Sequence, residues 1–343
     1  MSKSIEISPR IIFSTILIVL GLVFVYAVRD VIALLFIAVI IFSILDPIVD
    51  YMEKKKINRS LSVSLIYIAF FAILGIAFSF LIPPVIEQAK EFSKRLPEYS
   101  QNLQNSFLGI DAFFETQHIA LDTQIIVNDM VSGLTNFSGN IFSTTIGFFS
   151  GFISVMVVLV LAFYMTATKD GIKNFIVLLT PGAYKEYAAD SVMRVQSKIG
   201  RWMQGQIVLM FIIFVLDFIG LSIIGVPFAL ILAIFAGIME IIPYFGPIIS
   251  AIPGIILGFT ISPWIGFLAA VIYFVAQQFE SHIIVPQVMK KAVGLNPIAV
   301  ILALLVGIKL GGVLGAILSI PIATAAGVFL GDFFNKANPV GRD

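Results

Sequence analysis

The feature that most limits how this chain can fold is a broken apolar stretch between Val226 and Ser262. Two apolar arms flank the segment Glu240–Pro247. Each arm has about 13 to 15 residues and covers about 20 Å as a helix, which is less than the ~30 Å hydrocarbon core of a bilayer. Pro243 and Pro247 have no N–H, so a continuous helix through this segment is not expected. Because non-helical backbone at membrane depth is tolerated only inside protein or along a water-filled cavity, the stretch predicts a helical hairpin dipping into a membrane.

The composition of the chain agrees with a membrane protein. Hydrophobic residues make up 59% of the 343 residues and charged residues only 12%, with a mean hydropathy of +1.05. Soluble domains have about 25% charged residues, so we expect an integral membrane protein. The net charge of +1 gives no indication of a nucleic-acid partner. With no cysteine and two histidines, thiol catalysis, disulfides and a histidine-rich metal site are excluded, and we expect no cofactor and no metal.

The other apolar runs predict an all-α polytopic protein with about six full spans. These runs are Ile11–Val28, Val31–Leu45, Leu61–Ile82, Ile141–Thr168, Gln206–Ile224 and Trp264–Val285. The third run is expected to end at Pro83-Pro84. The expected parts are 1–83 (the first three spans), 84–140 (a small helical extracytoplasmic segment), 141–205 (the fourth span and an amphipathic linker), 206–262 (the fifth span and the first hairpin), 263–335 (a further span and a second hairpin) and 336–343 (a tail).

Charges in the loops predict the orientation of these spans. Basic residues concentrate in Lys54–Arg59 and in Lys169–Arg201, which places both loops on the cytoplasmic side of the membrane. The segment 84–140 is acidic and then falls outside. Both termini are expected in the cytoplasm, and the protein is expected to be multi-pass.

Two broken stretches of the chain resemble each other. Pro227–Ile238 aligns without a gap on Pro297–Ile308, and Gly246–Ser250 lies one position from Gly315–Ser319 in the same alignment. Each unit holds one span followed by one hairpin, and the two units enter the membrane from opposite sides. Inverted repeats with broken helices place a binding site near the midplane, where the repeats meet. Chance similarity between apolar segments is the alternative explanation.

Several motifs resemble those of the autoinducer-2 exporter family, also called PerM-type permeases. The motifs are Asp46–Ser60, Gly205-Gln206, Glu240–Pro253, His282–Pro297, Gly311-Gly312 and Ile320–Ala323. The resemblance implies a transporter of the bacterial-type inner membrane and a homo-oligomer, a pentamer in this family. It leaves the transported molecule open, because some members are described as sodium(lithium)/proton antiporters.

Charged residues inside apolar runs are the candidates for binding a solute or an ion, since each costs about 2.5 to 3.5 kcal/mol on insertion scales. Asp217 lies within the fifth span, whereas Glu240 and Lys309 lie where the two hairpins break. A structural role is the alternative for Asp217, and Lys309 could reach water instead. A polar stripe at i, i+4 and i+7 completes the candidates: Tyr273, Gln277 and Glu280. Hydrogen bonding between helices is the alternative for this stripe.

Prolines and glycines in the two hairpins are the candidate hinges. They are Pro243, Gly246, Pro247, Pro253, Gly311, Gly312 and Pro321. Proline and glycine interrupt helices by losing a hydrogen bond or by allowing unusual backbone angles. We expect the two hairpins to move as a unit against the other spans.

Three functions remain open from the sequence. The first is a secondary transporter that exports a small polar solute by alternating access, coupled to an ion gradient. The second is a sodium(lithium)/proton antiporter, which needs the acids but no roomy organic pocket. The third is a membrane scaffold without transport or an intramembrane enzyme. An enzyme is not expected, because the chain lacks His-Glu-x-x-His and Gly-x-Ser-x-Gly, and it lacks the Gly-x-x-x-x-Gly-Lys of ATP-driven pumps.

Overall fold

The described part of the protein is a helical membrane protein. The computed structural model describes residues 9–116, 128–133, 135–136, 154–288 and 296–337, and these residues form helices and no strands. Five helices are long and apolar enough to cross a membrane, or up to six when the pair Ser154–Ala167 and Gly171–Leu179, bent by 86°, counts as one span. The prediction of an all-α polytopic membrane protein is therefore confirmed.

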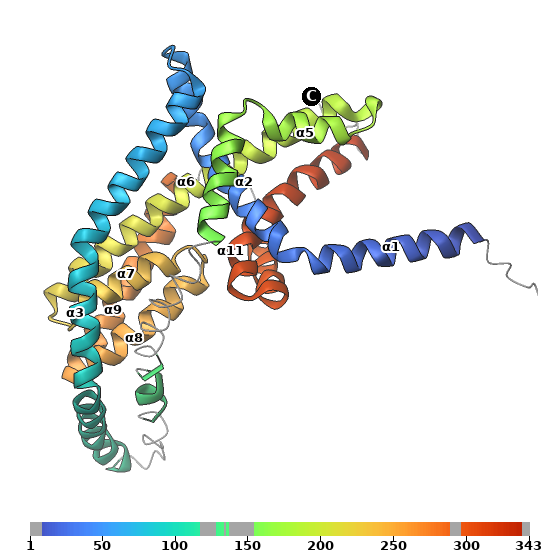
Figure 1. The fold of residues 1–343 in the computed structure, drawn as a ribbon. Helices are drawn as coiled ribbons and strands as arrows, with labels where there is room; N and C mark the ends of the chain where they lie inside the picture. Colours follow the sequence, from blue (N-terminus) through green and yellow to red (C-terminus); the bar gives the residue numbers. More distant parts are fainter. Residues whose placement is uncertain (1–8, 117–127, 134, 137–153, 289–295, 338–343) are drawn as a thin grey trace, which may run out of the picture.

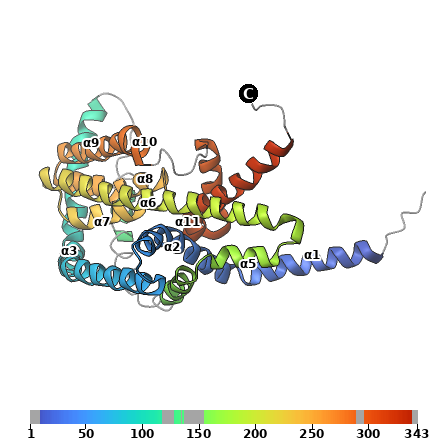
Figure 2. The same cartoon turned by 90° about the horizontal axis from the view of Figure 1, so that it is seen from above.

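The first three helices differ in how they pack. Helix α1 (Pro9–Ala27) projects away from the rest, whereas α2 (Arg29–Lys54) lies against the other helices and α3 (Arg59–Thr116) runs along one edge of the molecule (Figures 1 and 2). The prediction that the third span ends at Pro83-Pro84 is wrong, since α3 continues through both prolines for 58 residues in all.

Packing explains why α3 persists beyond its prolines. Its second half buries Phe92, Tyr99 and Leu103 in the largest apolar cluster of the described residues. The Phe92 and Phe228 rings meet edge to face, with 5.3 Å between their centroids. Burial of an aromatic side chain yields about 1.5 to 3 kcal/mol, comparable to the ~3 kcal/mol that a proline costs inside a helix. Tertiary contacts thus offset the local penalty.

Three helices follow the bend near residue 170. The amphipathic helix α5 (Gly171–Leu179) has no buried residue, and the short 3₁₀ helix η1 (Gly182–Tyr184) leads into α6 (Lys185–Ile223). Helix α6 joins the expected linker and the expected fifth span in one rod of 39 residues. Its buried residues recur along one face at helical spacing, ending with Ile213, Asp217 and Leu221.

The first hairpin consists of two short helices around a break, and the unusual backbone angle at this break does not belong to Gly246. Helices α7 (Ala229–Met239) and α8 (Phe245–Ile261) flank the break, and Tyr244, not Gly246, has the positive φ, at 67°. Gly246 is required for another reason, because a Cβ there would overlap the Met239 carbonyl and lie 3.1 Å from the Glu240 backbone nitrogen. The absence of a side chain at Gly246 thus lets the two arms approach closely.

The last part of the chain contains a further span and then the second hairpin. Helix α9 (Pro263–Phe279) continues into the π-helix η2 (Glu280–Ile284) and the short α10 (Val285–Val288). Helix α11 (Pro297–Ala337) is bent at Gly312, where φ is 58° and ψ is −135°. The two arms of α11 touch where a Cβ on Gly307 would meet the Gly315 carbonyl. Small residues at such crossings let membrane helices approach closely.

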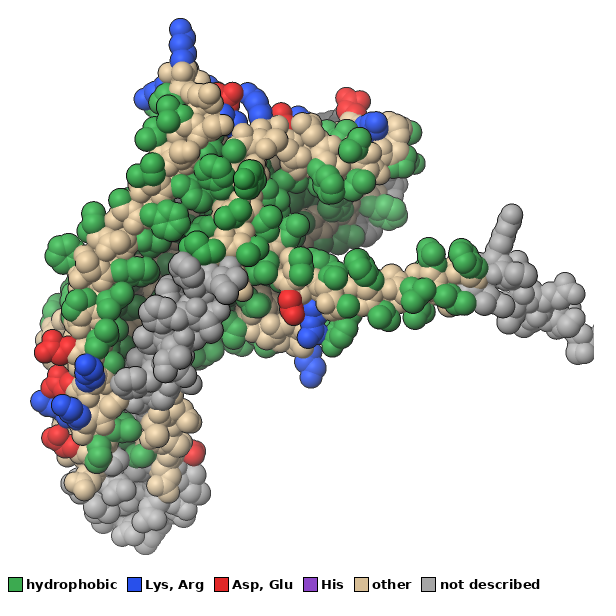
Figure 3. Space-filling model, viewed as in Figure 1, with side chains coloured by type: hydrophobic (Ala, Val, Ile, Leu, Met, Phe, Trp, Pro, Cys, Tyr) green, Lys and Arg blue, Asp and Glu red, His purple; other side chains and the backbone are tan. Residues whose placement is uncertain are grey.

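Charged side chains gather at the upper end of the molecule and along the lower part of α3, with a further acidic and basic group at the base of α1 and hydrophobic side chains over most of the surface between them (Figure 3). The two basic loops lie at the same end, because Lys169 donates a hydrogen bond of 2.9 Å to Glu53, beside Lys54. The sequence prediction that these loops share one side of the membrane agrees with this contact. An apolar band between charged ends is the expected arrangement for a bilayer.

Candidate functional site

Three acidic side chains from three elements lie buried together. Asp217 is on α6, Glu240 follows α7 in the break of the first hairpin, and Glu280 begins the π-helix η2. Their relative exposures are 2%, 1% and 6%. Each acid interacts electrostatically with at least one of the others. The fold therefore brings the break of the first hairpin against α6 and α9, and it concentrates acidic groups there.

A very small cavity lies beside these acids. It is lined by Asp217, Tyr273, Gln277 and Glu280 with Pro247, Ser250 and two apolar residues, and its volume is about 10 Å³. A cavity of roughly 10 to 15 Å³ holds about one water molecule. The site can therefore hold a bare or partly hydrated small ion, or a proton on one of the acids, whereas a sugar-sized solute does not fit in this conformation.

The carboxyl groups of Glu240 and Glu280 lie close enough to interact electrostatically. Two buried carboxylates repel each other when both are ionised, so a proton or a cation is needed to neutralise one of them. Gln277 Nε2 donates to Glu280 Oε2 over 3.1 Å, and Gln206 Nε2 donates to the Glu240 carbonyl over 2.5 Å. The amides hold the two acids in place, and their negative charge is what a bound proton or cation can neutralise.

No basic side chain neutralises this cluster within the described part of the chain, where none of the ion pairs includes one of the three acids. Asp217 Oδ1, Glu240 Oε2 and Tyr273 Oη are buried and have no hydrogen-bond partner among the residues that the structure describes. Buried polar atoms are nearly always paired, so three unpaired oxygens in one place indicate a site that binds something. The described residues contain no group of three or more acids, histidines or cysteines arranged to hold a metal ion.

The structure brings together five of the six residues that the sequence singles out for binding. Asp217, Tyr273, Gln277 and Glu280 line the cavity, and Glu240 contacts Glu280. The sixth, Lys309, is exposed and does not line this cavity; it lies close to the bend of α11. Its position agrees with the alternative explanation that Lys309 reaches water.

The candidate hinges fall into two groups. Pro243 lies in the break of the first hairpin, and Gly312 has the one non-helical backbone conformation found inside α11, next to Gly311. Pro247, Pro253 and Pro321 lie within helices, not at a break. Pro247 also lines the cavity, which couples the first turn of α8 to the acids.

Three further features of the site have weak or no signals in the sequence. Gln206 is 1% exposed and lies three helical turns before Asp217 on α6, so its spacing from Asp217 could have indicated a shared face. Ser250 is 1% exposed and lines the cavity from α8. The π-helix at Glu280 has no recognisable sequence signal, yet π-turns inside helices are frequent at functional sites.

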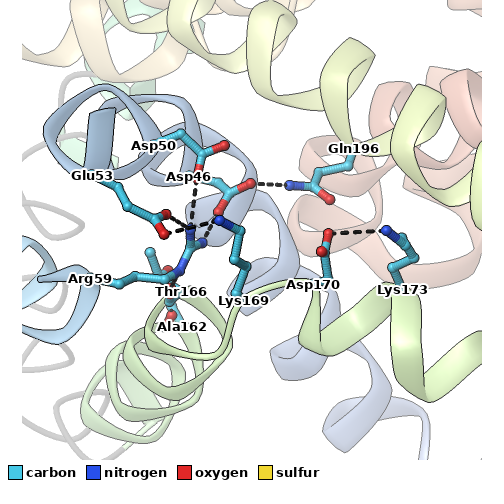
Figure 4. A network of polar contacts seen from close by, with 10 residues as sticks. All are labelled: Asp46, Asp50, Glu53, Arg59, Ala162, Thr166, Lys169, Asp170, Lys173 and Gln196. Carbon is cyan, nitrogen blue, oxygen red and sulfur yellow. Dashed lines mark hydrogen bonds and ion pairs between the residues drawn. The ribbon is translucent and has the colours of Figure 1, made fainter. Parts of the chain in front are cut away.

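A second polar network lies at the basic end of the molecule (Figure 4). Arg59, at the start of α3, forms ion pairs with Asp46, Asp50 and Glu53 on α2 and donates to the Thr166 carbonyl over 2.8 Å. The hydrogen bond to Glu53 raises the pKa of the Lys169 ammonium group. The network ties α2, α3 and the helix Ser154–Ala167 together.

Arg59→Ala is expected to lower the stability of the fold by about 3 kcal/mol, the lower end of the cost of removing one partner from a buried ion pair. The reason is that Arg59 is 10% exposed and its removal leaves the half-buried Asp46 without a cation. Thermal unfolding in detergent measures the effect. Arg95→Ala is the matched control, because its ion pair with Glu91 is half exposed and such pairs contribute up to about 1 kcal/mol. An equal loss in both variants would contradict the role given to Arg59.

Comparison with known proteins gives the family. The family model for AI-2E family transporters matches residues 12–335. This chain belongs to the AI-2E transporter family. Two Bacillus subtilis (strain 168) proteins are similar to it: "Putative transport protein YrrI", 28% identical over 85% of this chain and 83% of its own length, and "Putative transport protein YueF", 29% identical over 85% and 81%. A Thermotoga maritima relative named in the same way is 23% identical over 96% of both chains.

The family match extends over nearly the whole chain. It therefore includes the helices that form the acidic site and those that form the second polar network. The resemblance found in the sequence is confirmed. The relatives are named as transport proteins, which supports a membrane transporter and suggests that the chain is not an enzyme.

Proposed function

We propose that this AI-2E family member is a secondary transporter that exports a small polar solute by alternating access, with Asp217, Glu240 and Glu280 binding the coupling ion. The observation that carries the proposal is the buried pair Glu240–Glu280 with Asp217 nearby and no basic partner among the described residues. Ionisable residues in membrane spans are rare and line ion pathways or proton relays. A proton is the coupling ion that matches this chemistry, because the described acids are not arranged as a group that holds a metal ion.

The position of the acids supports coupling to hairpin movement. Glu240 belongs to the break of the first hairpin, whereas Asp217 and Glu280 belong to α6 and to η2. When both acids of the pair are ionised, the two buried carboxylates repel each other unless a proton or a cation enters. Binding or release of the ion therefore changes the force between the hairpin and its neighbours, with Gly312 and Pro243 as hinges.

A second candidate function, the sodium(lithium)/proton antiporter, is favoured by the size of the cavity. A volume of about 10 Å³ suits an ion and not an organic solute. In an antiporter the same acids exchange a proton for a metal cation, and no organic pocket is required. In the exporter the solute path is separate from the acids or opens in another conformation.

For either function we propose the inner membrane as the location, with both termini and the basic end in the cytoplasm. Positive residues favour the cytoplasmic side, and the loops beside Glu53 and Lys169 meet at one end. We also propose a homo-oligomer and no enzymatic activity, in line with the family resemblance.

Vesicles containing the purified protein and a pH-sensitive dye test the proposal. A sodium or lithium pulse that changes the internal pH, with no response in Glu240→Gln, supports the antiporter. No response to cations, together with proton movement driven by a panel of small polar metabolites and lost in Glu240→Gln, supports the exporter. A response of equal size in Glu240→Gln and in the wild type overturns both functions.

A further inference from the structure

Two cavities of opposite chemistry adjoin each other at the basic end of the molecule. The larger has a volume of about 590 Å³ and the smaller about 300 Å³, and Gln196 on α6 lines both. The larger volume falls within the ~300–1,000 Å³ typical of ligand pockets. Neither cavity shares a lining residue with the acidic site.

The larger cavity is apolar. Its walls come from α2, α5, α6, α11 and the helix Ser154–Ala167, and Tyr164, Thr168 and Gln196 are its only lining residues with a polar side-chain atom. Phe175 on α5 and Phe329 on α11 line it with side chains that are 63% and 48% exposed. In Figure 3 hydrophobic side chains surround a hollow beneath the lobe that contains α5. The cavity is therefore open at its side and attracts hydrocarbon, not water.

The smaller cavity is polar and mostly acidic. Asp46, Asp50 and Asp170 line it together with a single basic side chain, Arg201. Asp46 is engaged by Arg59 and by Gln196, which donates over 2.8 Å (Figure 4). Asp50 pairs with Arg59 over 2.7 Å and Asp170 with Lys173 over 3.4 Å, but their side chains are 49% and 46% exposed, so each carboxylate keeps room for a further donor. Arg201 is exposed and forms none of the ion pairs found among the described residues; its Nε donates to the Ser197 carbonyl. A group with both charges matches this lining better than a simple anion.

The two cavities follow each other along α2 in the order expected for a lipid. The apolar cavity uses Leu35 to Phe42 of α2, and the polar cavity uses Ser43 to Asp50, which leads to the charged end of the helix. A molecule that fills both therefore has its hydrocarbon in the apolar band and its polar head at the membrane surface. Membrane lipids have this shape and surround the protein at high concentration.

We propose that this double cavity binds an amine-bearing phospholipid. An acyl chain occupies the apolar cavity, the phosphate contacts Arg201, and the primary ammonium group faces Asp50 and Asp170. A primary ammonium has three N–H donors for carboxylates, whereas a choline head has none and a glycerol head has no positive charge. The inference is independent of the transported solute and of the acidic site.

Native mass spectrometry of the purified full-length protein tests the inference. Phosphatidylethanolamine, phosphatidylcholine and phosphatidylglycerol with identical acyl chains are added in turn. We expect phosphatidylethanolamine to be retained about fivefold more than the other two, the preference that one or two exposed charge contacts give. Equal retention of all three lipids, or a preference for phosphatidylglycerol, overturns the amine assignment.

Matched variants locate the lipid. Val39→Trp fills the apolar cavity and is expected to abolish retention, whereas Val31→Trp, on an exposed part of the same helix outside the cavity, leaves it unchanged. Asp50→Asn is expected to lower the preference for phosphatidylethanolamine, and Arg201→Gln to lower retention of phosphatidylethanolamine and phosphatidylglycerol alike. Unchanged retention in Val39→Trp overturns the site, and so does a second copy of the chain bound in place of lipid.

Discussion

Glu280→Gln is expected to reduce transport by at least about tenfold, the lower end of what the loss of a group supporting an ion site costs. Glutamine has nearly the same volume, so packing around the π-helix is kept. It cannot ionise, however, so the Glu240–Glu280 pair loses one of its two titratable groups. Flux in vesicles, normalised to the amount of protein reconstituted, measures the effect.

Two companion variants separate a functional effect from a structural one. Glu91→Gln changes an exposed acid on α3 and is expected to leave transport unchanged. Tyr273→Phe removes a buried hydroxyl that has no partner in the described part of the chain, so the unfolding temperature is expected to stay equal or rise while transport falls. A stable Glu280→Gln variant with full activity would show that the acid has no part in coupling.

Gly246→Ala is expected to destabilise the first hairpin by about 1 to 3 kcal/mol, the usual cost of forcing an extra methyl group into a packed place. The added Cβ overlaps the Met239 carbonyl and must push α7 and α8 apart. Because Glu240 directly follows Met239, transport is expected to fall with stability. The unfolding temperature in detergent is expected to drop by roughly 2 to 6 °C.

Gly311→Ala is the matched control, since it adds the same methyl group near the bend of the second hairpin. No atom lies within 4 Å of a Cβ at Gly311, and its φ is not positive. We expect a change in stability close to zero. A loss in Gly311→Ala as large as that in Gly246→Ala would mean that glycine acts through backbone freedom and not through the close contact with Met239.

The sequence predicts much of the fold, because hydrophobicity alone defines most membrane helices. Prolines and glycines mark both hairpin breaks, and the i, i+4, i+7 spacing places Tyr273, Gln277 and Glu280 on one face of α9 and η2. Isolated acids in apolar runs can also be recognised in a sequence, because an ionisable residue inside a membrane span is energetically costly and therefore rare.

Other features depend on contacts between distant segments. Helix α3 continues past Pro83-Pro84 because Phe92 packs against Phe228, which no local rule reveals. The pairing of Glu240 with Glu280 depends on how the first hairpin docks on α9. Lys309 is exposed, unlike Glu240 at the other break, and a symmetric sequence pattern does not show which of the two breaks is buried.

A triple variant tests whether the three buried acids bind the coupling ion. Asp217→Asn, Glu240→Gln and Glu280→Gln are combined, and internal pH is followed in vesicles under gradients of sodium, lithium and a mixture of small polar metabolites. We predict that at least one gradient moves protons through the wild-type protein and that none does so through the folded triple variant. Proton movement at the wild-type rate in the triple variant would show that the three acids do not bind the coupling ion.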